Sequence, residues 1–179
     1  MTIGNEPYGV VEFQIAPYTD ASTGTAGTWV SAPKRKTFTV TPSTNVVTNT
    51  YNDGPGSSVT SLTGATLTGT LAGVPLAFIA AALGLTLTLS GTGASATQSI
   101  SIPKAGATPP LMAARWRQIL VDENGQDQTV RVEGIRFPPA LALTATESAH
   151  TNQEFSATVE GVATGLVTVT QRTTAAAFT

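Results

Sequence analysis

Alternation of apolar and polar residues, the pattern of a strand with one buried face, recurs along most of the chain. Residues 37–41 alternate cleanly and place Phe38 and Val40 on one face. Residues 62–71 place Leu67 and Leu71 on a common face. We expect further strands at residues 10–15, 85–89, 141–143, 155–159 and 166–169. The pattern therefore predicts many short strands.

The longest apolar stretch, residues 71–89, predicts a short helix followed by a strand. Pro75 suits the first turn of a helix, and Gly84 suits the left-handed residue that ends one. Alternation at residues 85–89 favours a strand there over a membrane-spanning helix. The helix, at about residues 74–83, is apolar all round. We expect it either to lie between two sheets or to cover one sheet and be capped by a neighbouring subunit.

A hairpin is predicted where residues 115–121 and 128–135 flank Asn124-Gly125, because Asn-Gly favours a two-residue turn with positive φ at both positions. Centring the turn there pairs Ile119 with Val130, Val121 with Gln128, and Arg117 with Val132. This register collects Ile119, Val121, Val130 and Val132 on one face. After Gly134 the apolar positions change parity, which predicts a bulge.

These elements predict a mainly β chain, an antiparallel β-sandwich or barrel-like domain with one short flanking α-helix at about residues 74–83. Threonine is the commonest residue, and 17 Gly and 11 Pro accompany it, as expected for many strands and turns. Residues 42–58 are polar and irregular, so they form either a flexible loop or an extended hairpin. We expect a single domain over residues 1–179, with a flexible C-terminal tail at 173–179.

Charged residues are scarce: 9 Lys and Arg and 11 Asp and Glu make 11% of the chain, against about 25% in typical soluble domains. Such a neutral surface favours association. Dedicated nucleic-acid binding is disfavoured, because Lys34-Arg35-Lys36 is the only basic run and the aromatic residues do not interleave with basic ones. That run is best interpreted as a solvated strand entrance. The N-terminus shows no secretory signal, so we expect a soluble, cytoplasmic chain.

No residue set indicates catalysis, a cofactor or a metal. The chain has no Cys, and its one His, His150, lies in Glu147-Ser148-Ala149-His150, a sequence that we interpret as a loop rather than a catalytic triad. Gly91-Thr92-Gly93 is too short for a dinucleotide motif. Asp122, Glu123, Asn124 and Asp127 lack the spacing of a calcium loop, so we expect a solvated hairpin tip. We therefore expect no enzyme.

The order of elements resembles that of the major tail tube proteins of long-tailed bacteriophages. The segment that carries the resemblance is Ala65–Gly84, a Thr-rich strand that runs directly into a short apolar helix ending in glycine. An N-terminal strand, the long excursion at 42–58 and a C-terminal half made of strands complete the arrangement. The resemblance covers most of the chain but rests on no short motif.

The resemblance implies a sandwich with a flanking helix that forms hexameric rings, with inner strands lining a channel and loops bridging stacked rings. The implied partners are further copies of the chain, a tape-measure protein, terminator and tip proteins, and DNA in passage. The implied location is the virion tail, assembled in the bacterial cytoplasm. Contacts between subunits or rings are expected at residues of the excursion and, secondarily, of the N-terminus: Val46, Val47, Tyr51 and Asp53, then Glu6, Pro7 and Tyr8.

Two other classes remain open on the sequence. One is a different virion component, such as a head decoration protein, a tail terminator or a baseplate protein. The other is a monomeric binding module of immunoglobulin-like or sugar-binding type. The oligomeric state distinguishes them, because a decoration protein would form closed trimers and a binding module would stay monomeric.

Overall fold

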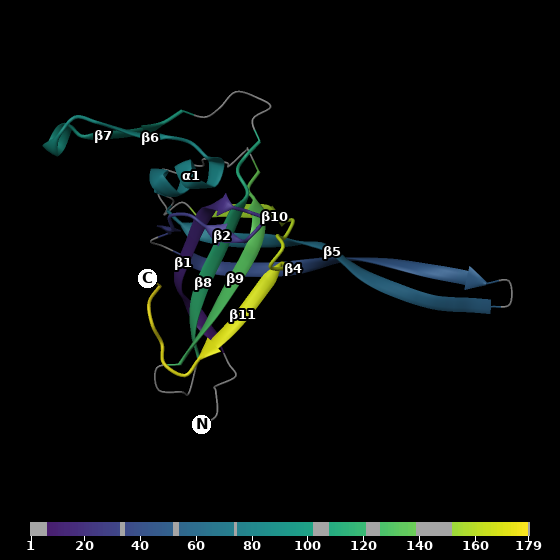
Figure 1. Cartoon of the computed structure of the whole chain (residues 1–179). Helices are drawn as coiled ribbons and strands as arrows, with labels where there is room; N and C mark the ends of the chain where they lie inside the picture. The colour runs from purple at the N-terminus through teal and green to yellow at the C-terminus, as the bar shows by residue number, and fades with distance from the viewer. Residues whose placement is uncertain are drawn as a thin grey trace.

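A computed structural model describes residues 7–32, 35–51, 54–73, 75–101, 108–120, 126–138 and 152–178. The described part of the chain is mainly β and antiparallel, with one α-helix, as predicted, and its strands do not close into a barrel. Figure 1 shows a compact body from which two hairpins project. The predicted strand at 141–143, Glu147–His150 and Lys34 lie outside the described residues.

Nine strands form one strongly bent sheet, and its order is β2-β1-β8-β9-β10-β5-β4, with β3 paired to β1 and β11 paired to β9. Two further strands form a separate pair, β6-β7. The bounds are β1 Pro7–Asp20, β2 Thr25–Ala26, β3 Val30–Ser31, β4 Arg35–Tyr51, β5 Gly54–Ala72, β6 Leu87–Ser90, β7 Thr97–Ile100, β8 Met112–Leu120, β9 Asp127–Arg136, β10 Asn152–Val159 and β11 Val167–Arg172.

The sheet folds over so that β4, β5 and β10 face β1, β8 and β9 across an aromatic core. Phe13 of β1 stacks on Phe38 of β4 with ring centroids 4.0 Å apart, which joins the two layers. Phe155 of β10 and Trp116 of β8 pack beside Phe38. Gly69 lies between Phe38 and Phe155 in the ladder, and the two rings fill the space that a side chain at residue 69 would need. The alternation at Phe38, Val40, Leu67 and Leu71 is thus confirmed as the core side of this layer.

The predicted helix forms as α1, Leu76–Leu83, which begins two residues after the predicted start because Pro75 is the N-cap residue. Gly84 ends it in the left-handed conformation, with φ 66°, as predicted. Phe78 joins the core beside Phe13, and Ala77 is exposed. None of the helices in the described part of the chain has the length and apolar character to cross a membrane.

The predicted hairpin forms between β8 and β9, but the predicted register was wrong by three residues. Ile119 lies opposite Asp127 instead of Val130, and Trp116 takes the place opposite Val130. The odd shift exchanges the faces of β8: Trp116 is buried, whereas Ile119 is 42% exposed. Arg117 therefore lies opposite Thr129 on the outer face, rather than opposite Val132.

The predicted bulge at Gly134 is confirmed. The β8–β9 register shifts between Met112 and Ala114, and Gly134 has φ 68°. The Gly134 N–H donates to the Tyr18 hydroxyl over 2.9 Å, and that hydroxyl donates in turn to Glu133. The bulge is thereby fastened to β1.

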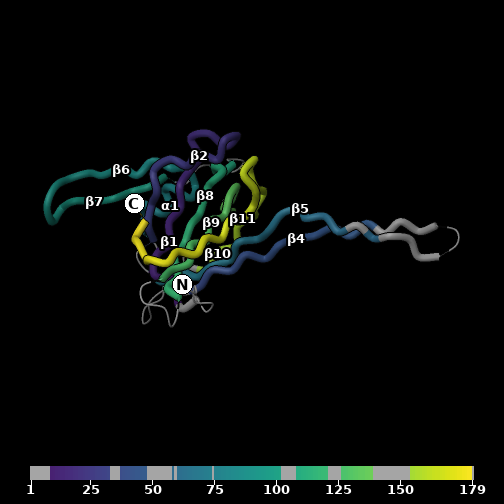
Figure 2. The backbone as a smooth tube through the Cα atoms, turned by 60° about the horizontal axis from the view of Figure 1, so that its bottom comes forward, coloured from purple at the N-terminus to yellow at the C-terminus, as the bar shows by residue number. Residues whose placement is uncertain are grey.

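The excursion at 42–58 is an extended hairpin, the second of the two predicted possibilities. It is the outer part of β4 and β5, paired from Ser43 with Gly64 to Tyr51 with Gly54. We call residues 43–64 the long arm. The hairpin of β6 and β7, residues 87–100, projects from the opposite side of the body (Figures 1 and 2). We call it the short arm.

Candidate assembly surfaces

The described side chains of the long arm form no core of their own. Val46, Val47 and Leu62 are 56%, 51% and 55% exposed, and every arm residue whose burial is described is exposed except Gly64 at its base. A two-stranded hairpin without a packed face is at best marginally stable in water. An arm with three exposed aliphatic side chains therefore gains most from packing against another surface.

Both arms lie in a part of the sequence that is almost free of charge. Between Lys36 and Lys104 the only charged residue is Asp53. Exposed strand edges are commonly protected from pairing by Lys or other charges. The arms lack this protection, so their edges are open to another chain.

The short arm repeats these properties on a smaller scale. Leu89 is 67% exposed, and Ser90 to Ser99 are all exposed. The two strands pair from Leu87 with Ile100 to Ser90 with Thr97. Because the two arms leave opposite sides of the body, a single surface of one neighbour cannot accept both.

Several strand edges of the body, including one edge of β11, are also open among the described strands, and two of them bound the same sheet segment. β4 pairs with β5 along one edge, and its other edge pairs with no described strand. β10 pairs with β5 along its whole length, but with β9 only at Thr158 and Val159. The three strands β10, β5 and β4 thus form a sheet segment with a free or largely free edge at each end.

The outward face of this segment carries hydroxyl groups in a regular grid. Outward residues of β4, β5 and β10 lie opposite one another in three rows across the strands. The rows are Thr37-Thr70-Glu154, Thr39-Thr68-Ser156 and Thr41-Thr66-Thr158. We call these nine residues the hydroxyl face; all are exposed or half-buried, and a shallow concavity of about 420 Å³ lies over part of them.

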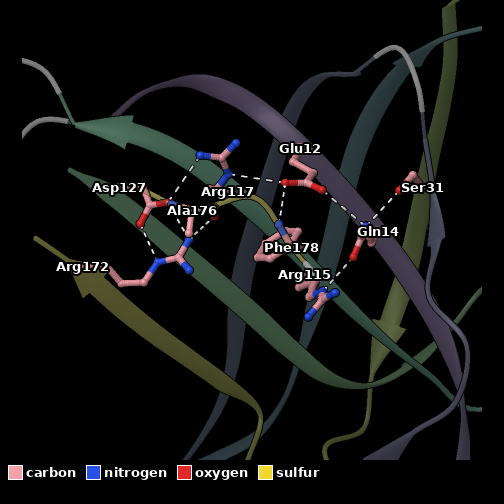
Figure 3. Close-up of polar contacts among 9 residues, drawn as sticks. All are labelled: Glu12, Gln14, Ser31, Arg115, Arg117, Asp127, Arg172, Ala176 and Phe178. Atoms are coloured by element: carbon pink, nitrogen blue, oxygen red, sulfur yellow. Dashed lines mark hydrogen bonds and ion pairs between the residues drawn. The ribbon is translucent and has the colours of Figure 1, made fainter. Parts of the chain in front are cut away.

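The opposite layer, in contrast, carries a charged network on its outward face (Figure 3). Arg172 of β11 donates from Nε to Oδ1 of Asp127 over 2.7 Å, and its Nη2 donates to Oδ2 over 2.5 Å. Arg117 bridges Asp127 and Glu12, each at 3.4 Å. Asp127 is fully buried, so its predicted place on a solvated hairpin tip was wrong. Asp122, Glu123 and Asn124 lie outside the described residues.

The C-terminal segment lies across this network and covers it. The Ala176 N–H donates to Asp127 over 3.2 Å, and the Phe178 N–H donates to Glu12 over 3.1 Å. The Arg115 guanidinium lies between two rings, 4.1 Å from the centroid of Trp29 and 4.2 Å from that of Phe178. Burial lowers the pKa of Arg115, but the guanidinium remains charged near neutrality. Aromatic and basic residues therefore do interleave here, although as an internal stack.

Asp127 predicts an acid-sensitive domain. Burial alone would raise the pKa of its carboxyl, but hydrogen bonds from Arg172 and Ala176, with the charge of Arg172, hold that pKa below its usual range. The carboxylate therefore stabilises the fold above about pH 4, and this contribution is lost as pH falls through the lowered pKa. We expect Asp127→Asn to lower the free energy of unfolding at pH 7 by about 2 kcal/mol and to flatten its acid dependence.

The measurement is urea unfolding at pH 7 and pH 3, followed by tryptophan fluorescence. Asp20→Asn is the matched control, because the Asp20 carboxylate is exposed and bonds only within its own turn. It should leave stability at pH 7 nearly unchanged. An Asp127→Asn protein as stable as the parent at pH 7 would contradict the role given to the network.

The sequence-predicted contact residues fall in three groups. Val46 and Val47 are exposed on the long arm, and Tyr51 is at its outer end, opposite Gly54. Pro7 and Tyr8 begin β1, opposite Leu120 and Ile119 of β8. Glu6 and Asp53 lie outside the described residues. The two sets are not brought together, because β1 belongs to the body and the arm projects away from it (Figure 1).

Several surface residues were not predicted from the sequence. Leu62 and Leu89 could have been found from their place in a stretch of sequence that is almost free of charge. The contacts of Glu12 with Phe178 join residues from the two ends of the chain, and no local pattern indicates them.

Among the described residues, no group of three His, Cys, Asp or Glu side chains is placed to hold a metal ion. The amino-acid sequence matches no protein-family model and no curated protein.

Proposed function

We propose that this chain is a non-catalytic structural subunit whose copies close into rings, hexameric by family resemblance, that stack into the tube of a phage tail and enclose a channel for DNA. The observation that carries the proposal is the long arm: a hairpin whose single charged residue is Asp53, with exposed aliphatic side chains, that projects from a body with a packed core. A monomer would gain nothing from such a projection, whereas a neighbouring copy could bury it.

Two candidate contact surfaces that face different directions favour a stack of rings over a closed dimer. The long arm continues β4 and β5 beyond the body, so it projects along the strands. The open edges of β4 and β10 face sideways, across the strands. One heterologous contact can close a ring, and a second, in another direction, can repeat along the axis. We propose that β4 of one copy pairs with β10 of the next within a ring, and that the long arm joins successive rings.

The remaining parts of the proposal come from the family resemblance. The tube would lie in the virion tail after assembly in the bacterial cytoplasm. It would surround a tape-measure protein, end at terminator and tip proteins, and later conduct DNA. None of these partners requires a catalytic group or a cofactor.

Negative-stain electron microscopy over a concentration series, with sedimentation velocity in parallel, tests the proposal. We expect hollow rings or tubes of uniform width, with large species growing at the expense of monomer as concentration rises. Closed trimers would favour a head decoration protein instead. A chain that stays monomeric at every concentration would favour the binding module.

A further inference from the structure

We infer that the hydroxyl face is the wall of the channel, a neutral polar lining that a polyanion can pass without binding; the inference rests on the proposed function. The starting point is the pairing of open edges. If β4 of one copy pairs with β10 of the next, the segments β10-β5-β4 become one continuous sheet around the ring. Such a wall has one inner and one outer face.

The position of the body decides which face is inward. On the core side of the segment lie β1, β8 and β9, joined to it through the stacked rings of Phe13 and Phe38. Neighbouring copies converge on the concave side of a closed ring and diverge on its convex side, so the second layer and α1 have more room on the convex side. The body therefore lies outside, and the hydroxyl face lies inside.

The charges of the chain agree with this orientation. None of the nine residues of the hydroxyl face is basic, and Glu154 is its single carboxylate. The outward face of the other layer carries Arg115, Arg117 and Arg172 in the charged network. Tight binding of DNA needs Lys or Arg at the phosphates. A wall of threonine and serine hydroxyls is hydrated but offers phosphates no positive charge. It therefore suits the passage of DNA and not its retention.

The absence of cysteine from the chain allows a direct test. Thr68→Cys places one thiol at the centre of the hydroxyl face, between Thr39 and Ser156. Thr170→Cys is the matched control, an exposed threonine on the outward face of β11, opposite Thr129. Each variant is assembled, labelled with a small maleimide-gold cluster, and imaged by cryo-electron microscopy. Dispersed subunits are labelled in parallel, to show that both thiols react when free.

We expect gold inside the tube for Thr68→Cys and on its outer surface for Thr170→Cys. Tubes with gold on the outside for Thr68→Cys would overturn the inference and leave the proposed function standing. So would tubes in which this thiol no longer reacts although the dispersed subunit does, because the face would then be buried between copies. A chain that forms no rings or tubes would overturn both.

Discussion

Replacing residues 44–63 by Asn-Gly is expected to abolish assembly and leave a folded monomer. Ser43 and Gly64 are paired, so the two-residue turn can close the shortened hairpin without changing the strands that enter the core. Every removed side chain whose burial is described is exposed, so the free energy of unfolding should change by about 1 kcal/mol or less. Circular dichroism checks the fold, and sedimentation velocity with electron microscopy checks assembly.

A charge placed on the intact arm tests whether assembly needs the uncharged surface of the arm and not only its length. Val47→Lys keeps the hairpin but puts an ammonium group among its uncharged residues, so rings or tubes should again be lost. Thr168→Lys adds the same charge to the outward face of β11 and should assemble normally. Undisturbed assembly of the shortened chain would show that the arm is not a contact, and its failure to fold would show that the arm belongs to the domain.

Gly134→Ala is expected to destabilise the domain by about 3 kcal/mol or more. Gly134 has φ 68°, a conformation that costs other residues roughly 1–2 kcal/mol. A Cβ atom there would lie 2.3 Å from the carbonyl oxygen of Gly161, which is backbone and cannot rotate away. Relief of the clash must move the bulge and so weaken the 2.7 Å hydrogen bond from the Glu160 N–H to the Gly134 carbonyl.

Gly73→Ala is the control for backbone strain alone. Gly73 has φ 78°, but nothing lies within 4 Å of the position of its Cβ. Its cost should be only about 1 kcal/mol, from the left-handed conformation. Urea unfolding measured by the fluorescence of buried Trp116 compares the two variants. Equal losses would mean that the backbone at Gly161, between β10 and β11, moves away freely and that the bulge is not rigid.

The fold could be predicted wherever one short segment contained all the sequence information that decides its structure. The helix was predicted because Pro75 and Gly84 mark its two ends. The bulge was predicted because the parity of apolar residues changes at Gly134. Phe38 and Val40 were placed on the core side because alternation alone decides which face of a strand is buried.

The predicted register of β8 and β9 was wrong because it followed a local turn preference and took only part of the core packing into account. Asn-Gly favours a tight turn, but burial of Trp116 opposite Val130 requires a register three residues away. Trp116 buries far more apolar area than Ile119, so packing prevails over the turn. The pairing of Asp127 with Arg172 joins distant residues, and no spacing in the sequence points to it.

The structure of the long arm could be predicted only in part. Its residues alternate poorly, since valine and leucine occur on both of its faces, and a hairpin exposed on both sides needs no alternation. The sequence therefore left a loop and a hairpin equally possible. Its proposed role as a contact surface rests on the exposure of its described side chains.

Contacts made through the two arms would hardly respond to ionic strength. Asp53 is the only charge between Lys36 and Lys104, so there is almost nothing on either arm for dissolved ions to screen. Salts would act on these contacts mainly through the cohesion of water, and sulfate or phosphate would strengthen them slightly. An assembly joined in this way would have nearly the same stability at low and at high ionic strength.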